Sequence, residues 1–278
     1  MGWGRTGRTG QAGQAGRTAP LLGPVALVLL LGAAVPDSIS AQDRLPNLTV
    51  SGKTPCRVHP ESARETADLW ETARTILEAT VRTDSAPPTL LIREWERTLD
   101  FRLRVRYERS DTSEVKSRNP FFNKAAPSNL ERVGYIQRQG WSVVYIGPGP
   151  RLLLSERFLR SHCFGKVAGE GANAGLVGLT FDPLPRTTIP DVRGVLWIDP
   201  VQGELRSMEY TWINPPPEAR APAIGGWAHF ARVGSAGWMV QRWNLRTARP
   251  EGGYTRGFDG YTDHGGEVIA IVSPSPTP

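Results

Sequence analysis

Histidine and cysteine, the residues that most often carry catalysis and metal binding, are both scarce in this chain. It has four histidines, at positions 59, 162, 229 and 264, and two cysteines, Cys56 and Cys163. The chain has no HExxH or HxH pair, no GxSxG, no P-loop and no dinucleotide-binding fingerprint following an expected strand. We therefore predict no catalytic residue, no metal ligand and no cofactor.

Lysine is also rare, and the chain has no basic block. Four of its 33 basic residues are lysines, and the formal net charge is +6, or +4 without residues 1–41. Binding of nucleic acid by positive charge requires a concentrated basic patch. Nucleic acid is therefore not an expected partner.

Long apolar runs are absent except for one near the start, residues 21–35. Three arginines and no acid precede it, and the small-residue stretch "PDSISAQD" follows it. A basic start, a short apolar middle and a small-residue exit are typical of a secretory signal peptide. The run is shorter than the roughly 20 residues of a membrane-spanning helix, and a retained anchor is the alternative. We expect a signal peptide over residues 1–41, export to the periplasm or beyond, and no transmembrane span in the mature chain.

Export decides the expected role of the two cysteines, because thiols pair in oxidising compartments. The economical prediction is a Cys56–Cys163 disulfide, which closes a loop of about 108 residues and stabilises the fold by about 4–5 kcal/mol in the chain-entropy model. Two alternatives stay open. Cys56, His59, His162 and Cys163 could together hold zinc, or Cys163 could be a nucleophile with His162 as its base.

Residues 59–84 have the period of an amphipathic helix, with Trp70, Leu77 and Val81 on one stripe. The segment "DSAPP" at 84–88 ends it. We expect this helix to pack on a sheet.

The period then changes to two. In residues 98–110, "TLDFRLRVRYERS", apolar and charged residues alternate, which predicts a strand with one apolar face. Its arginines at 102, 104 and 106 are expected to form a solvated face, with anion binding as the alternative. Further strands and turns are expected in these segments: 134–148, 175–184, 193–213, 227–246 and 265–272. Residues 152–164 predict one short helix with Ser155 as its N-cap.

One helix followed by successive hairpins predicts an α+β fold. We expect a single domain over residues 42–272, built on a curved, half-barrel-like antiparallel meander with the N-terminal helix packed on it. The Pro/Ser tail at 273–278 is expected to be disordered. The proline-rich segment 214–226 is expected to be a surface loop rather than a domain linker.

Several phrases resemble a known protein group: "REWERTLD", "NPFF", "IGPGPRLLLSERFLRSHCF", "LVGLTFDP", "RGVLWIDPVQGELRSMEYTW" and "GWMVQRWNLR". Over most of residues 55–250 the chain resembles the C-terminal part of secreted bacterial carboxypeptidase regulatory-like domain-containing proteins. We expect the N-terminal sandwich that gives those proteins their name to be absent here, because only about a dozen residues separate the expected signal peptide from Cys56. The resemblance implies no peptidase activity and carries over no catalytic residue. The helix and the hairpin at 194–205 are also similar to the half-barrel sheets of periplasmic lipoprotein carriers, which enclose an apolar groove.

Tryptophan is the residue that most suggests a ligand surface. Apolar residues on both faces of "GWMVQRWNLR" indicate that something covers the second face, and four tryptophans form the expected ligand face: Trp197, Trp212, Trp238 and Trp243. Residues 258–267 gather acidic side chains that could hold calcium, but their spacing favours ordinary turns. The leading functional hypothesis is a non-catalytic exported binding or scaffolding module, with an apolar ligand or an envelope protein as partner. The alternatives are a hydrolase using His162 and Cys163, and a carbohydrate-binding module.

Overall fold

A computed structural model describes residues 60–81, 87–120, 130, 132–139, 142–184, 188–233, 237–250 and 258–272. By its internal contacts the chain divides into residues 1–41 and residues 42–278. Every described residue lies in the second unit. The predicted signal peptide, the C-terminal tail and Cys56 lie outside the described residues.

The predicted N-terminal helix is confirmed as α1, Pro60–Val81. Trp70 is half-buried, and the side chains of Ala73, Ile76, Leu77 and Thr80 are buried. The recurrence at three and four residues places these side chains on one face of the helix. The opposite face is polar, and Arg74 pairs there with Glu71 and Glu78.

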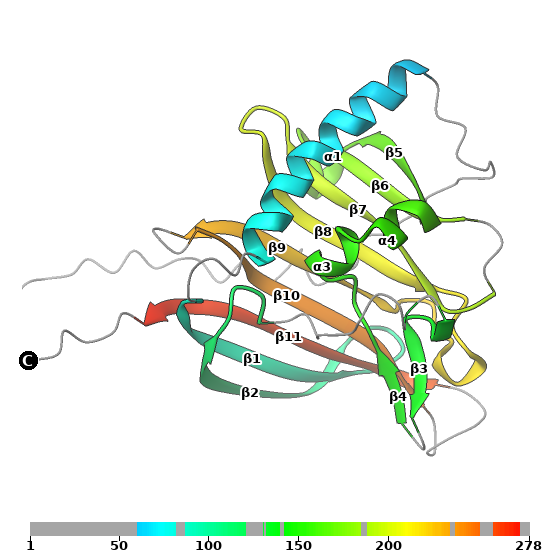
Figure 1. Cartoon of the computed structure of the whole chain (residues 1–278). Helices are drawn as coiled ribbons and strands as arrows, with labels where there is room; N and C mark the ends of the chain where they lie inside the picture. The colour runs from blue at the N-terminus through cyan, green and yellow to red at the C-terminus, as the bar shows by residue number, and fades with distance from the viewer. Residues whose placement is uncertain are drawn as a thin grey trace, which may run out of the picture. The chain divides into compact units, whose positions relative to one another are not determined.

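Nine strands form one antiparallel sheet in the order β2-β1-β11-β10-β9-β8-β7-β6-β5 (Figure 1). Strands β5 to β11 follow one another as a meander, and β11 then pairs with β1, which forms a hairpin with β2. The strands are β1 Thr89–Leu99, β2 Val105–Lys116, β5 His162–Ala168, β6 Val177–Pro183, β7 Asp191–Asp199, β8 Glu204–Ile213, β9 Gly225–Val233, β10 Gly237–Pro250 and β11 Phe258–Val272. This is the predicted α+β fold, an antiparallel meander with the N-terminal helix on one face.

Turn chemistry explains why the hairpins fall where the sequence predicts them. Gly203 has a φ of +62° between β7 and β8, and Gly237 has a φ of +78° at the start of β10. Glycine adopts this left-handed backbone without steric cost. Of the segment 214–226, residues 214–224 connect the neighbouring strands β8 and β9 and contain the short 3-10 helix η2, Pro217–Ala219, and the last two residues begin β9. The segment therefore joins two strands of one sheet, as expected.

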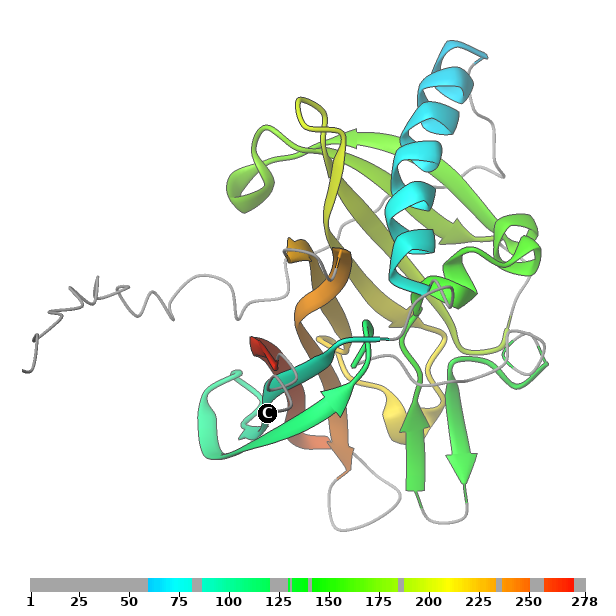
Figure 2. The same ribbon diagram turned by 60° about the vertical axis from the view of Figure 1, so that its left-hand side comes forward.

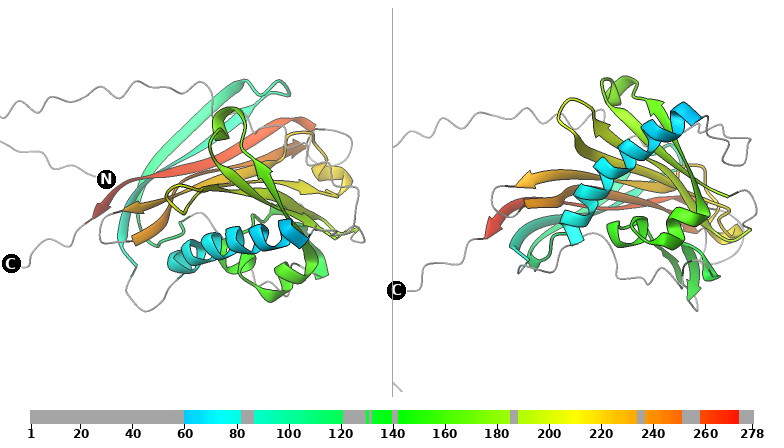
Figure 3. Two further views of the ribbon diagram at one scale, coloured as in Figure 1. Left: turned by 90° about the horizontal axis from the view of Figure 1, so that it is seen from above. Right: turned by 45° about the horizontal axis from the view of Figure 1, so that its top comes forward.

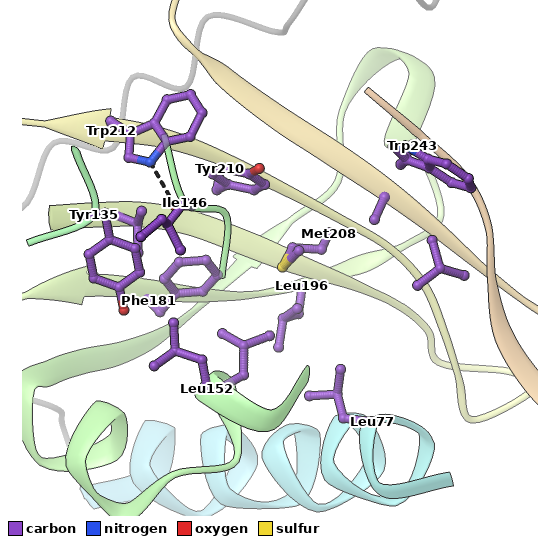
Figure 4. Packing of buried hydrophobic residues seen from close by; sticks show 14 of the residues in the cluster. Leu77, Tyr135, Ile146, Leu152, Phe181, Leu196, Met208, Tyr210, Trp212 and Trp243 are labelled. Atoms are coloured by element: carbon purple, nitrogen blue, oxygen red, sulfur yellow. Dashed lines mark hydrogen bonds between the residues drawn. The ribbon is translucent and has the colours of Figure 1, made fainter. Parts of the chain in front are cut away.

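The core fills the space between α1 and one face of the sheet. Figure 4 shows Leu77 of α1 facing Leu196 and Met208 of β7 and β8. These two sheet residues lie opposite each other in register, and Phe181, Tyr210 and Trp243 extend the same buried cluster. The helix-side face is therefore occupied by packed side chains.

The segment predicted as one helix over residues 152–164 is two short helices and the start of a strand. The helices are α3, Pro150–Leu153, and α4, Glu156–Ser161. Ser155 caps α4 as predicted, because its Oγ accepts a hydrogen bond from the backbone N–H of Phe158 at 3.2 Å. Beside them stands a separate hairpin of β3, Ile136–Gln139, and β4, Ser142–Tyr145.

The prediction of a single strand over residues 98–110 is wrong. Strand β1 ends at Leu99, β2 begins at Val105, and residues 100–104 form the turn between them. The Leu103 backbone N–H bonds the Asp100 carbonyl at 2.9 Å, and the Asp100 N–H bonds the Arg104 carbonyl at 3.0 Å. The alternation of apolar and charged residues continues through this turn, so periodicity alone did not reveal it.

The turns expected over residues 258–267 are also not there, because these residues belong to β11. Their acidic side chains pair with basic residues on neighbouring strands: Asp259 with Arg249, Asp263 with Arg246, and Glu267 with Arg93. No group of three metal-ligating side chains occurs among the described residues. The calcium alternative therefore has no cluster to support it.

The sheet is open at both edges and is not strongly curled (Figure 3). Helices α1, α3 and α4 lie on one side of it (Figure 2). The turn of the β1–β2 hairpin and the turn between β5 and β6 both rise on the other side (Figures 2 and 3). Among the described segments, no helix has both the length and the apolar character needed to cross a bilayer.

Candidate functional site

The face of the sheet opposite α1, α3 and α4, which we call the far face, carries polar and aromatic side chains. Residues that pair across strands share a face. One line of paired residues crosses six strands: Trp95, Gly265, Asn244, Trp227, Glu209 and Val195. The adjacent line is Arg93, Glu267, Arg242, His229, Ser207 and Trp197. On β7 and β8 these residues alternate with core residues such as Leu196 and Met208.

Three tryptophans lie on the far face: Trp95 on β1 and Trp227 on β9 in the first line, and Trp197 on β7 in the adjacent line. Trp95, Trp227 and Trp197 are 7%, 6% and 7% exposed. The Arg242 guanidinium lies 5.8 Å from the ring centre of Trp95 and 5.7 Å from that of Trp227. Arg97 covers Trp95 at 5.3 Å. Cation–π contacts of this kind hold the indoles in place and occupy part of their ring faces.

Glycine makes the close packing of Trp95 possible. A side-chain carbon at Gly265 would come within 2.3 Å of the Trp95 indole. At Gly178, which faces Trp197, it would come within 2.8 Å of that ring. The glycines therefore let large rings lie flat on the sheet.

Glu209 of β8 lies on the far face, where it pairs with Trp227 of β9 and Val195 of β7. Burial raises the pKa of its carboxyl, and two donors oppose that rise: the Asn173 amide and the Trp197 indole. Asn173 belongs to the 3-10 helix η1, Gly171–Asn173, and donates to Oε1 at 3.3 Å. The turn between β5 and β6 thus contacts the far face through the hydrogen bond between Asn173 and the Glu209 carboxylate.

Several buried polar atoms of the far face lack a hydrogen bond of normal geometry, and four of them lie around the tryptophans: Trp95 Nε1, Trp197 Nε1, Glu209 Oε2 and Arg242 Nε. Trp197 and Glu209 still interact with each other, because the Trp197 indole helps to lower the pKa of the Glu209 carboxyl. Arg242 Nε lies 3.8 Å from Glu267 Oε2, which is an ion pair too long for a hydrogen bond. Native proteins satisfy nearly all buried polar groups, so a concentration of unsatisfied donors and acceptors on one surface is informative.

His229 adds a titratable group to this surface. Its burial, assisted by the positive charge of Arg242, lowers its pKa to about 4. Its ring packs edge-on against Trp227 at 4.9 Å. At neutral pH the ring is therefore an uncharged member of the far face.

The residues of the hydrolase hypothesis are not arranged as a nucleophile and its base. His162 and Cys163 are consecutive in β5, so their side chains leave opposite faces of the strand. The ring of His162 is stacked on Phe158 at 3.8 Å. Both ring nitrogens lie 3.1 Å from main-chain carbonyls, Nδ1 from that of Phe158 and Nε2 from that of Val192. His162 thus bridges α4 and β7.

Cys163 is the one cysteine among the described residues, and it is not a free thiol. Its predicted partner, Cys56, lies outside the described residues, as does His59. The Cys56–Cys163 pairing and the zinc alternative are therefore untested and remain predictions.

The four tryptophans of the expected ligand face do not share a face. Trp212 and Trp243 belong to the core on the helix side, and Trp212 donates its indole N–H to the Ile146 carbonyl at 3.0 Å. Trp197 lies on the far face, and Trp238 is half-buried and packs against the core. Sequence reasoning missed Trp95, Trp227, Glu209 and Arg242, whose grouping depends on strand register.

A β-bulge explains why "GWMVQRWNLR" looks apolar on both faces. Val240 pairs with Phe230 and Arg242 pairs with His229, so Gln241 is an extra residue in β10. An extra residue reverses the alternation that follows it. Trp243 therefore lies on the helix side, together with Val240.

Comparison of the chain with protein-family models, curated proteins and solved structures finds no match. The resemblance to the carboxypeptidase regulatory-like group therefore remains a prediction from the sequence.

Proposed function

We propose that this protein is a non-catalytic exported binding module whose ligand binds on the far face of the sheet. The observation that carries the proposal is the set of buried polar atoms around Trp197 and Glu209 that lack a hydrogen bond of normal geometry. A buried donor or acceptor without a partner costs about 1–3 kcal/mol. A ligand that displaces the side chains covering these atoms and supplies the missing partners gains that free energy on binding.

The chemistry of these atoms favours a hydroxyl-rich ligand. The indole N–H groups of Trp95 and Trp197 and the Nε–H of Arg242 need acceptors. Glu209, when ionised, needs donors. A hydroxyl group supplies both, so a glycan or another polyol matches the set better than a purely anionic or apolar molecule. This favours the carbohydrate-binding hypothesis, with hydrogen bonding rather than ring stacking as its basis.

An apolar ligand between helix and sheet is less well supported. The space it would occupy holds packed side chains of α1, β7 and β8, with Leu77, Leu196 and Met208 at its centre. The far face, by contrast, carries charged and amide side chains beside its tryptophans. The expected similarity to lipoprotein carriers stays a prediction, and the packed core gives no support to an apolar groove.

The experiment is a glycan array with the secreted protein, followed by calorimetric titration of any glycan that binds. Trp197→Phe removes one unsatisfied N–H and keeps an aromatic ring, and we expect it to weaken binding by about tenfold, the loss of one good hydrogen bond. Glu209→Gln is expected to weaken binding similarly.

The matched control is Trp212→Phe, which removes an indole N–H on the helix side. That N–H is already bonded to Ile146, so the variant should lose stability and keep its affinity. Thermal unfolding identifies any variant that fails to fold. Failure to bind any glycan, or equal affinity of the Trp197→Phe and parent proteins, would contradict the proposal.

A further inference from the structure

The exposed apolar side chains of this protein are concentrated at one turn. Seven large apolar residues are exposed in the described part of the chain, and three of them lie within residues 101–107. They are Phe101, 64% exposed, Val105, 50% exposed, and Tyr107, 59% exposed. We call residues 100–107, which are the turn of the β1–β2 hairpin and the first three residues of β2, the hairpin tip. Clusters of exposed apolar side chains usually mark an interaction surface.

The hairpin tip has a fixed conformation. The Asp100 carboxylate accepts hydrogen bonds from the backbone N–H groups of Arg102 and Arg104, each at 2.9 Å. Its other oxygen bonds Nε of Arg104 at 3.1 Å and Nη2 of Arg106 at 2.7 Å. Leu103 has a φ of +64°, which is unusual for a bulky residue and is maintained by these contacts. Strained positions that the surroundings hold in place are common at functional sites.

The hairpin tip is positively charged. Arg102, Arg104 and Arg106 outnumber the single carboxylate of Asp100. The nearby Arg249 and Asp259 pair with each other at 2.6 Å and add no net charge. The Arg102 guanidinium lies 5.4 Å from the Phe101 ring centre, so cation and aromatic ring stand together at the end of the turn.

The hairpin tip also projects from the sheet. It rises on the side opposite α1 in two separate views (Figures 2 and 3). All but one residue of β2 is exposed, so the strand leading from the tip is solvated on both sides. A projecting turn offers a convex surface, which fits a flat partner better than it fits a peptide or a small ligand.

We propose that the hairpin tip docks the protein onto a bilayer surface that contains anionic lipids. Aromatic rings prefer the region of the lipid headgroups, and arginines beside them pair with anionic phosphates. Phe101 and Tyr107 enter the interface while Arg102 stays at headgroup level. One small apolar turn with few charges gives weak, reversible attachment rather than insertion.

The experiment is co-sedimentation of the secreted protein with vesicles of phosphatidylethanolamine and phosphatidylglycerol, compared with pure phosphatidylcholine. The test variant is Phe101→Ser with Arg102→Gln, because neither side chain holds the Asp100 network. The control variant is Val201→Ser with Arg151→Gln, which makes the same types of change at exposed positions of another turn and of α3.

We expect binding to the anionic vesicles, a loss of about tenfold in the test variant, and little change in the control. Equal binding to both vesicle types, equal losses in both variants, or no binding would overturn the proposal. Self-association of the protein that the test variant abolishes would also overturn it, since a second copy would then occupy the tip. Glycan binding is measured separately, so either proposal can fail without the other.

Discussion

Arg246 and Asp263 form a buried ion pair across β10 and β11. Nε of the arginine lies 2.6 Å from Oδ1, and Nη2 lies 2.6 Å from Oδ2. Their side chains are 1% and 3% exposed. The two residues pair directly in register on the same sheet face as Asn244 and Gly265, so this two-bond contact locks the alignment of β10 and β11.

Removing one partner of this pair should be strongly destabilising. We expect Asp263→Ala to lower the free energy of unfolding by about 3–5 kcal/mol, because it leaves a buried guanidinium without its counter-ion. The double variant Arg246→Met with Asp263→Leu should lose much less, since it removes both charges. Denaturant unfolding measures both. A single variant as stable as the parent would show that the pair is not buried in solution.

His229 predicts a pH dependence of stability. Burial, with Arg242 as the second cause, lowers its pKa to about 4, below the ordinary value of about 6.5. Between these values the unfolded chain binds a proton and the folded chain does not, so stability falls as the pH drops from about 6.5 to about 4. His229→Gln should reduce this slope in unfolding curves measured across that range. An unchanged slope would assign the dependence to other groups.

Asp100 predicts a second, more acidic dependence. The hydrogen bond from the Arg104 backbone N–H is the largest cause that lowers its pKa to about 2. Its stabilising effect is complete above the unfolded value of about 4 and is lost as the pH falls towards 2. Asp100→Asn should lower the melting temperature at neutral pH and flatten the change between pH 4 and pH 2. Melting curves identical to those of the parent protein would contradict a structural role for this carboxylate.

The packing of Trp95 can be tested through the glycine beneath it. Gly265→Ala places a methyl group within 2.3 Å of the indole. We expect a loss of about 1–3 kcal/mol in stability and a shift in tryptophan fluorescence as the ring is displaced. Gly165→Ala is the milder comparison, because its methyl group would meet only Thr180 Oγ1, at 3.0 Å. Equal effects of the two substitutions would argue against the Trp95 contact.

The sequence predicted the main elements because their signals are local. The helix pattern around Trp70 and Leu77 and the turn glycine Gly203 depend on neighbours within a few residues. The α+β fold follows from one helix and consecutive hairpins. The Ser155 cap was also predictable, since it needs only the side chain and the first turn that follows it.

The composition of the two sheet faces was not predictable, because it depends on register. The extra residue at Gln241 moves Trp243 to the helix side, and no local pattern announces it. The turn at residues 100–104 is held by the Asp100 carboxylate and has no glycine or proline to signal it. The Trp95–Gly265 contact joins residues far apart in the chain. The residues of the far face are brought together by the cross-strand register, which residue propensities do not encode.

The central claim is that a hydroxyl-rich ligand satisfies the indole N–H groups of the far face. Tryptophan-labelled protein shows each indole N–H as a separate nitrogen–proton NMR signal, and Trp95→Phe, Trp197→Phe and Trp212→Phe assign three of them. The account predicts that a bound glycan shifts the Trp95 and Trp197 signals and leaves that of Trp212 in place. Saturable binding that leaves the Trp95 and Trp197 signals unmoved would contradict it.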